Sequence, residues 1–190
     1  MAFYDDTALA CDTGNIELVR PAGRREITHA IHDVDGTHSH IRQWPPIMSV
    51  TLHHAMTCGL GADYDSPAAA ERLMELSGRR ELPETDRFCT ESAGLSALTQ
   101  MEWAIRRAVE SGNVPDDPRL DLTPAQRETN SQVIRRIWDG QERFDDLDEP
   151  PGFREFLAEH TPRLFRLYET VLNGACRDRN TADARRDPAK

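Results

Sequence analysis

Two aspartates one residue apart are the strongest chemical signal in this sequence. Asp33 and Asp35 lie in the segment Asp-Val-Asp-Gly-Thr, which follows a short apolar run at residues 27–31. A strand ending at Asp33 would bring both carboxylates to the edge of a sheet, where open α/β folds bind ligands. Gly36 would allow a tight turn and close approach of a ligand. One carboxylate could then attack phosphorus while the other protonates the leaving oxygen, and Mg²⁺ held by oxygen ligands would neutralise the phosphoryl charge.

The aspartate segment and the run before it resemble the first motif of the haloacid-dehalogenase-like (HAD) hydrolases, in which an apolar strand ends in Asp-x-Asp-Gly-Thr. The resemblance implies that Asp33 is a nucleophile that forms an aspartyl-phosphate and also binds Mg²⁺. It implies that Asp35 is the general acid/base and binds the metal through its backbone carbonyl. An Asp at the second position is typical of the phosphatases of that superfamily. The implied activity is magnesium-dependent hydrolysis of a phosphomonoester of a small metabolite, with Gly36 and Thr37 beside the substrate.

The residues after the motif, Asp-Gly-Thr-His-Ser-His-Ile-Arg-Gln-Trp, are similar to HAD phosphatases in which a helical insert follows. The implied fold class is α/β, with the start of a HAD-like Rossmannoid core at residues 1–44 and a large all-α cap at 45–175. Residues 176–190 would be a polar tail or a return towards the core. Such a cap covers the phosphate, excludes water and selects the substrate. The guanidinium of Arg42 suits an anionic substrate group, although a solvated position at the entry to a helix is the alternative.

The later motifs of the family are not recognisable in this sequence. They comprise a Ser or Thr after a second strand, a Lys or Arg, and an acidic pair after a later strand. Lys190 is the only lysine, and the acidic pair Asp145–Asp146 is not preceded by an apolar strand. The chain therefore resembles the N-terminal portion of a capped HAD phosphatase. We expect it to hydrolyse little by itself and to need a second chain or fragment that completes the core.

Composition excludes several other classes of protein. The chain has 33 Asp and Glu against 23 Lys and Arg, a net charge of −10, which repels a phosphate backbone, so we expect no nucleic-acid partner. We find neither a secretory signal nor a run long enough to span a membrane, and expect a cytoplasmic protein. The four cysteines are widely spaced, which argues against a zinc knuckle and a disulfide framework.

The rest of the chain carries helical patterns. Apolar residues recur every three or four positions at Leu95, Leu98, Met101, Ile105 and Ala108. Start and stop signals predict further helices from Pro45 to Gly59, from Ser66-Pro67 to Gly78, after the Thr123/Gln126 capping box, and as a pair from Phe153 to about Leu172 interrupted at Thr161-Pro162. Two short strands are expected at residues 16–20 and 27–31. We interpret Trp44, Trp103 and Trp138 as core residues.

Two other functions remain open. The chain could be a helical binding module in which Asp-Val-Asp-Gly-Thr is only a polar turn, because Asp and Gly are common in turns. It could also be a histidine-dependent metal hydrolase. The histidines concerned are His29, His32, His38 and His40 around the aspartates, and the His53-His54 pair on a predicted helix.

Overall fold

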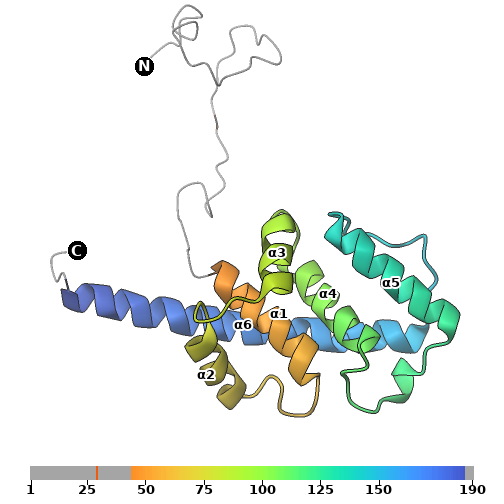
Figure 1. Ribbon diagram of the computed structural model, residues 1–190, viewed down its shortest axis with the longest axis horizontal. Helices are drawn as coiled ribbons and strands as arrows, with labels where there is room; N and C mark the ends of the chain where they lie inside the picture. The colour runs from red at the N-terminus through yellow and green to blue at the C-terminus, as the bar shows by residue number, and fades with distance from the viewer. Residues whose placement is uncertain (1–28, 30–43, 187–190) are drawn as a thin grey trace, which may run out of the picture. The chain divides into compact units, whose positions relative to one another are not determined.

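The computed structural model describes His29 and residues 44–186. Six α-helices and one short 3₁₀ helix make up the described part of the chain (Figure 1). They are α1 (Trp44–Cys58), α2 (Pro67–Leu76), α3 (Pro83–Glu91), α4 (Ala97–Glu110), η2 (Pro118–Leu120), α5 (Pro124–Trp138) and α6 (Pro151–Arg186). All of them belong to the second of the two units into which the chain divides, residues 1–40 and 41–190.

The α/β fold class expected from the sequence is wrong for the part of the chain that the structure describes. This part forms helices only, without a strand or a sheet. The expected strand at 16–20 lies outside the described residues, and so does the strand at 27–31 except for His29, which is exposed and belongs to no strand. The physical reason is the spacing of apolar residues after Trp44, which recur every three or four positions and so form the buried face of a helix.

Helix starts follow the predicted capping residues. The Ser66 hydroxyl accepts a hydrogen bond from the Ala69 amide at 3.2 Å, and Pro67 takes the first helical position of α2. At the start of α5, the side chains of Thr123 and Gln126 each accept a hydrogen bond from the other's backbone amide. Such caps satisfy amides that have no partner within the helix. The predicted starts of α2 and α5 are therefore confirmed.

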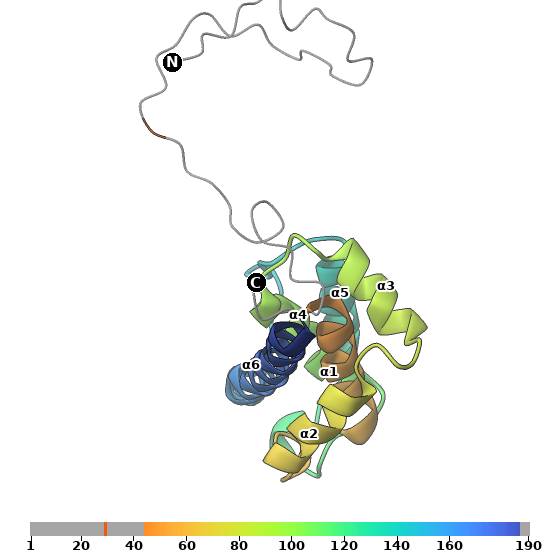
Figure 2. The same cartoon turned by 90° about the vertical axis from the view of Figure 1, so that its left-hand side faces the viewer.

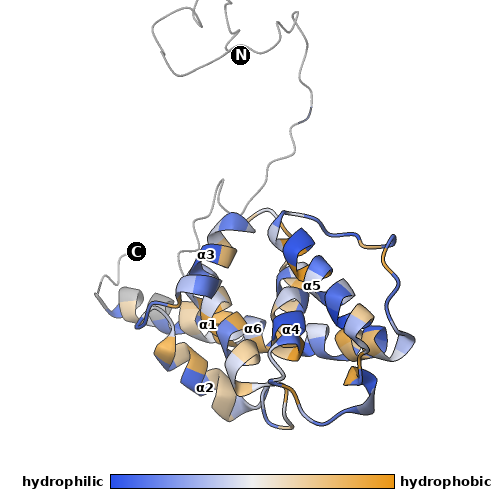
Figure 3. Cartoon of the chain, turned by 45° about the vertical axis from the view of Figure 1, so that its right-hand side comes forward, coloured by the Kyte–Doolittle hydropathy of each residue, from blue (hydrophilic) through white to orange (hydrophobic). Residues whose placement is uncertain are grey.

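The core forms around α1 and α4. α1 packs against α2, α3, α4 and α6, and α4 packs against α1, α5 and α6. Figure 3 shows that α1 is mainly apolar whereas α5 is mainly polar. Fully buried Trp103 of α4 stacks on Phe88 of α3, with ring centroids 3.8 Å apart, and half-buried Trp138 of α5 lies against both rings. The interpretation of Trp103 and Trp138 as core residues is confirmed.

Helix α6 passes through the predicted break at Pro162 and continues to Arg186 (Figure 1). Proline lacks the amide hydrogen that would bond to the carbonyl of Ala158, which normally favours a break. Tertiary packing outweighs this cost, because Phe156 and Leu164, on either side of the proline, are both fully buried. The predicted interruption at Thr161-Pro162 and the predicted end near Leu172 are wrong. Figure 2, which views the molecule along α6, shows the other helices beside it.

Two further details differ from the sequence pattern. Leu98 falls on the predicted apolar face of α4 but is 47% exposed, because it lies in the first turn, where this face is not covered. α3 was not expected, because Thr85, Phe88 and Cys89 are its buried residues and the rest of the helix is polar. Within the described ranges, no helix is both long and apolar enough to cross a lipid bilayer.

Candidate functional site

The residues predicted to carry chemistry lie outside the described part of the chain. They are Asp33, Asp35, Gly36, Thr37 and Arg42. Trp44, two residues after Arg42, begins α1 and is half-buried against the helical core. The sites that the structure does describe are therefore groups of polar side chains on the helices.

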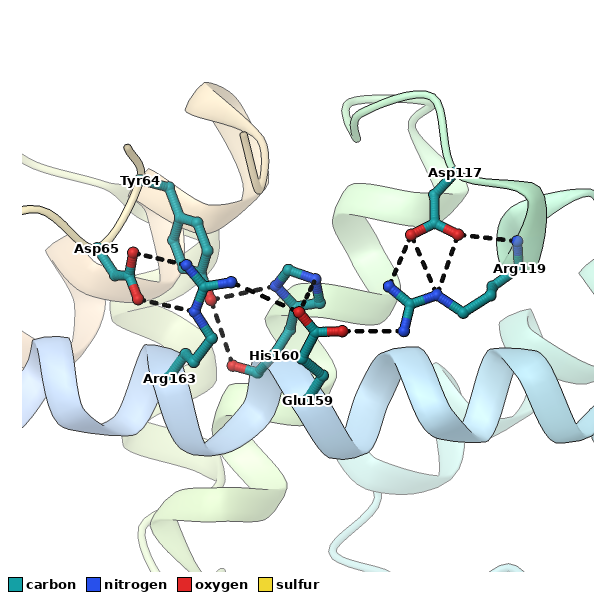
Figure 4. A network of polar contacts seen from close by, with 7 residues as sticks. All are labelled: Tyr64, Asp65, Asp117, Arg119, Glu159, His160 and Arg163. Carbon is teal, nitrogen blue, oxygen red and sulfur yellow. Dashed lines mark hydrogen bonds and ion pairs between the residues drawn. The ribbon is translucent and has the colours of Figure 1, made fainter. Parts of the chain in front are cut away.

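The most extended of these is the α6 network (Figure 4), which consists of Tyr64, Asp65, Asp117, Arg119, Glu159, His160 and Arg163. Arg163 of α6 donates two hydrogen bonds, each 2.9 Å long, to the carboxylate oxygens of Asp65. Arg119 of η2 donates to Asp117 at 2.7 Å and to Oε2 of Glu159 at 2.9 Å. The network thus ties α6 to the segment before α2 and to η2.

The two aromatic members of the network are buried and neutral. The Tyr64 hydroxyl lies 3.2 Å from Nδ1 of His160, and the ring of Phe156 packs at 4.3 Å from the His160 ring, centroid to centroid. Burial lowers the pKa of His160, although the nearby Glu159 carboxylate opposes this shift. Burial also raises the pKa of Tyr64. The Tyr64 hydroxyl thus contacts Nδ1 of a neutral His160 ring, and it also donates a hydrogen bond to the His160 carbonyl oxygen at 3.5 Å.

The carboxylates of the α6 network are paired with arginines in a way that suits a structural role. Hydrogen bonds from Arg163 lower the pKa of Asp65, and hydrogen bonds from Arg119 lower the pKa values of Asp117 and Glu159. A general base that works near neutral pH needs a pKa close to the operating pH, and these carboxylates are shifted the opposite way. Each carboxylate already has a guanidinium partner, so the network has no free acid to offer a substrate.

A second polar group is buried between α4, α5 and the loop before α6. Arg106 is 1% exposed, and its Nη1 and Nη2 donate to the two oxygens of Glu149 at 2.6 and 3.0 Å. Its Nε donates to Glu102 at 2.8 Å, and Nη1 also donates to Oδ1 of Asn130 at 3.1 Å. These bonds replace the water that the guanidinium loses on burial.

Sequence reasoning missed both groups, although it contained signals for them. His160 follows Phe153, Phe156 and Leu157 at the three- and four-residue spacing of a buried helix face. That spacing predicts a buried histidine. By contrast, Glu149 belongs to the acidic segment 144–150, which the pattern correctly indicates as a loop, and nothing local marks it as the partner of Arg106.

The two histidines of α1 are at least half-buried in the helical unit. Nε2 of His54 lies 2.9 Å from the carbonyl oxygen of Tyr64. His53 is half-buried, and burial together with the charge of Arg80 lowers its pKa. In the ranges described, no group of three or more His, Cys, Asp or Glu side chains could hold a metal ion. His53 and His54 therefore do not build the metal site of the histidine hypothesis with other described residues, while His32, His38 and His40 lie outside those residues.

Comparison with protein-family models, with curated proteins and with solved structures finds no match.

Proposed function

We propose that this protein is a magnesium-dependent phosphatase that hydrolyses a phosphomonoester of a small metabolite. The observation that carries the proposal is the segment Asp33-Val-Asp35-Gly-Thr, with its two carboxylates one residue apart and a glycine directly after them. A nucleophilic carboxylate and a second carboxyl group for proton transfer are the groups that a two-step hydrolysis needs.

The two aspartates divide the reaction between them. A carboxylate oxygen of Asp33 attacks phosphorus and forms an acyl-phosphate bond, while the bond between phosphorus and the ester oxygen breaks. Asp35, protonated at this stage, gives its proton to the departing oxygen. In the second step, the Asp35 carboxylate takes a proton from water as that water attacks phosphorus. Inorganic phosphate leaves, and Asp33 returns to its carboxylate form.

The donor atoms of the segment suit Mg²⁺. An Asp33 carboxylate oxygen and the backbone carbonyl of Asp35 are hard oxygen ligands of the kind this ion prefers. When bound, the ion would neutralise negative charge on the phosphoryl group. Gly36 and Thr37 would lie beside the substrate, and Arg42 could pair with an anionic group of it.

The helical unit has the role of a substrate-selecting cap in this proposal. What supports this role is its place in the sequence, because α1 begins at Trp44, seven positions after Thr37. We further propose a cytoplasmic enzyme that acts on a small phosphorylated metabolite, with a second chain or segment supplying the later motifs of the reaction.

Steady-state assays test the proposal. The protein is isolated from its own cells together with whatever co-purifies, and is given a panel of phosphate esters with and without Mg²⁺. Replacing the nucleophile in Asp33→Asn should lower kcat by at least about a thousandfold, and Asp35→Asn by about a hundredfold or more. Asp145→Asn, in the loop before α6, is the matched acidic control and should leave kcat unchanged. Activity that persists in Asp33→Asn would exclude the proposed nucleophile.

The helical packing favours a second candidate, a binding module. α1, α4 and α6 bury a shared apolar core, and among the residues that the structure describes its members lie between Trp44 and Ala175. Such a unit predicts a single cooperative melting transition whose Tm does not respond to Mg²⁺. A rise in Tm with added Mg²⁺ that disappears in Asp33→Asn would count against it, since a ligand that binds the native state raises Tm.

A further inference from the structure

A pocket of about 260 Å³ lies where the loop between α2 and α3 meets the first turns of α1. Pro46 and Val50 of α1 form one wall, Leu76 at the end of α2 forms another, and Leu82 and Asp86 line the side of α3. All of these elements belong to the helical unit. The described residues that line the pocket therefore all come from that unit.

Two consecutive arginines, Arg79 and Arg80, also line this pocket. Gly78 turns the chain after α2 with a φ of +70°, a conformation that side chains other than glycine rarely adopt. The turn lies close to α1, since a Cβ on Gly78 would be 4.0 Å from Cβ of Pro46. A backbone constraint thus fixes the start of the segment that carries both guanidinium groups.

The charged groups that line the pocket differ in their partners. Among the residues that the structure describes, neither Arg79 nor Arg80 has a carboxylate within ion-pair distance, unlike Arg106, Arg119 and Arg163. Two carboxylates do line the pocket. Asp86 accepts hydrogen bonds from the Leu82 amide at 2.8 Å and from the Ser49 hydroxyl, so its oxygens are engaged.

Glu81, the other carboxylate, is exposed to solvent. Together with Asp86 it balances the two guanidinium groups, so the lining carries no net charge. Guanidinium groups bind phosphate and carboxylate through paired hydrogen bonds. Because the oxygens of Asp86 are already engaged, Arg79 and Arg80 supply the donors that remain for an anion.

The apolar walls indicate that the ligand has a carbon skeleton. Leu76 is 50% exposed and lines the pocket together with Val50 and Pro46. A short hydrocarbon chain lying there would remove apolar surface from water, which favours binding. Inorganic phosphate has no apolar part and would leave this surface exposed to water.

We propose that this pocket binds a small organic anion, with Arg79 and Arg80 holding a phosphate or carboxylate group while Leu76 and Val50 cover a short carbon chain. The ligand site goes beyond the phosphatase reaction, because it needs neither Mg²⁺ nor the aspartate segment. Its location next to His53, whose pKa responds to the charge of Arg80, provides a nearby spectroscopic reporter.

An NMR titration of the full chain tests the proposal. Inorganic phosphate, butyl phosphate and butyrate are each added in buffer with EDTA and without Mg²⁺, at constant ionic strength. We expect shifts in the amides of residues 78–82 and in the ring of His53, and a lower Kd for an organic anion than for inorganic phosphate. Tighter binding of butyl phosphate assigns the pocket to phosphates, and tighter binding of butyrate assigns it to carboxylates.

Matched variants test whether the anion binds at Arg79 and Arg80. Arg79→Gln/Arg80→Gln should weaken binding of the preferred anion by at least about tenfold, since each lost charge-assisted hydrogen bond costs about 1.5 kcal/mol or more. Arg72→Gln/Arg143→Gln removes two exposed arginines outside the pocket and should leave Kd unchanged. Asp33→Asn should also bind normally, which separates this site from the phosphatase proposal. Equal Kd values for the two double variants would overturn the anion pocket.

Discussion

The guanidinium of Arg106 and the carboxylate of Glu149 form a bidentate ion pair, at 2.6 and 3.0 Å, inside the helical unit. Arg106 comes from the middle of α4, whereas Glu149 precedes α6 by two residues. The pair therefore fixes the entry of the longest described helix onto the core. Because Arg106 is almost completely buried, water cannot replace Glu149 if this partner is lost, and Glu102 remains as the other described carboxylate bound to Arg106.

Removing the charge of Glu149 should strongly destabilise the protein. We expect Glu149→Gln to lower the free energy of unfolding by about 2 kcal/mol, because the buried guanidinium loses its bidentate carboxylate and keeps only the Glu102 carboxylate as a charged partner. Denaturant unfolding measures this change. The matched control is Glu128→Gln, which breaks the exposed pair between Glu128 and Arg135 and should cost less than about 1 kcal/mol. Equal costs at the two sites would show that Arg106 is not desolvated.

Stability should fall as the pH drops below about 6.5, the unperturbed histidine pKa. The folded-state pKa of His160 is lowered by burial, so the unfolded chain takes up a proton that the folded chain refuses. The stabilisation that depends on neutral His160 is fully present above pH 6.5 and is lost as the pH falls towards the folded-state pKa. Below that pKa, His160 causes no further change in the free energy of unfolding. Tm measured between pH 5 and pH 8 should follow this course.

The variant His160→Asn should flatten that pH dependence. The asparagine side-chain amide can hydrogen-bond to the Tyr64 hydroxyl as a donor or as an acceptor, and the side chain does not titrate. The pKa of His53 is also lowered. The variant His53→Asn therefore shows how much of the pH dependence of Tm comes from each histidine. A pH profile unchanged by both substitutions would mean that neither ring loses its proton on folding. The carboxylates of the α6 network act in a separate range, below about pH 4.5.

Two glycines with the same backbone conformation should differ in their tolerance of alanine. Gly59 after α1 and Gly112 after α4 have φ angles of +70° and +69°. A Cβ on Gly59 would lie 2.8 Å from the carbonyl oxygen of Asn113, whereas a Cβ on Gly112 would meet nothing within 4 Å. Gly112→Ala should therefore cost about 1 kcal/mol for the left-handed conformation alone.

Gly59→Ala should cost at least about 1 kcal/mol more than Gly112→Ala, because the backbone of Asn113 must move. Asn113 cannot shift freely, since its side-chain amide donates a 2.6 Å hydrogen bond to the carbonyl of Met56. Thermal unfolding of the two variants side by side gives the difference. Equal losses of stability would indicate that the ends of α1 and α4 are less closely joined than the structure has them.

Local sequence signals predicted much of the helical unit. The caps at Ser66 and Thr123 located the starts of α2 and α5, because a capping hydrogen bond depends only on residues within one turn. The predicted break at Pro162 was wrong, because a proline acts only on its own turn. The continuity of α6 depends on the packing of Phe156 and Leu164 against other helices. Long-range partners such as Arg106 and Glu149 are 43 residues apart and have no local signature.

The candidate functional residues also differ in whether the sequence could predict them. The aspartate pair at Asp33 and Asp35 is a short motif and was visible at once in the sequence, but it lies outside the described residues and stays a prediction. The pocket with Arg79 and Arg80 was not predicted, because it depends on α1, α2 and α3 meeting in space. Motif spacing therefore predicted the chemistry, whereas the pocket that we propose as a ligand site could be found only from the packed helices.

The most direct test of the phosphatase account is to trap the phosphoryl group on the chain. The protein, isolated with whatever co-purifies, is mixed with p-nitrophenyl phosphate and Mg²⁺, quenched in acid and mapped by mass spectrometry. In Asp35→Asn, which lacks the base for the second step, we predict that one phosphoryl group accumulates on Asp33, because p-nitrophenolate leaves without needing a proton. Asp33→Asn should carry none. Release of p-nitrophenol with no phosphoryl group on Asp33, or with the group on another residue, would contradict the account.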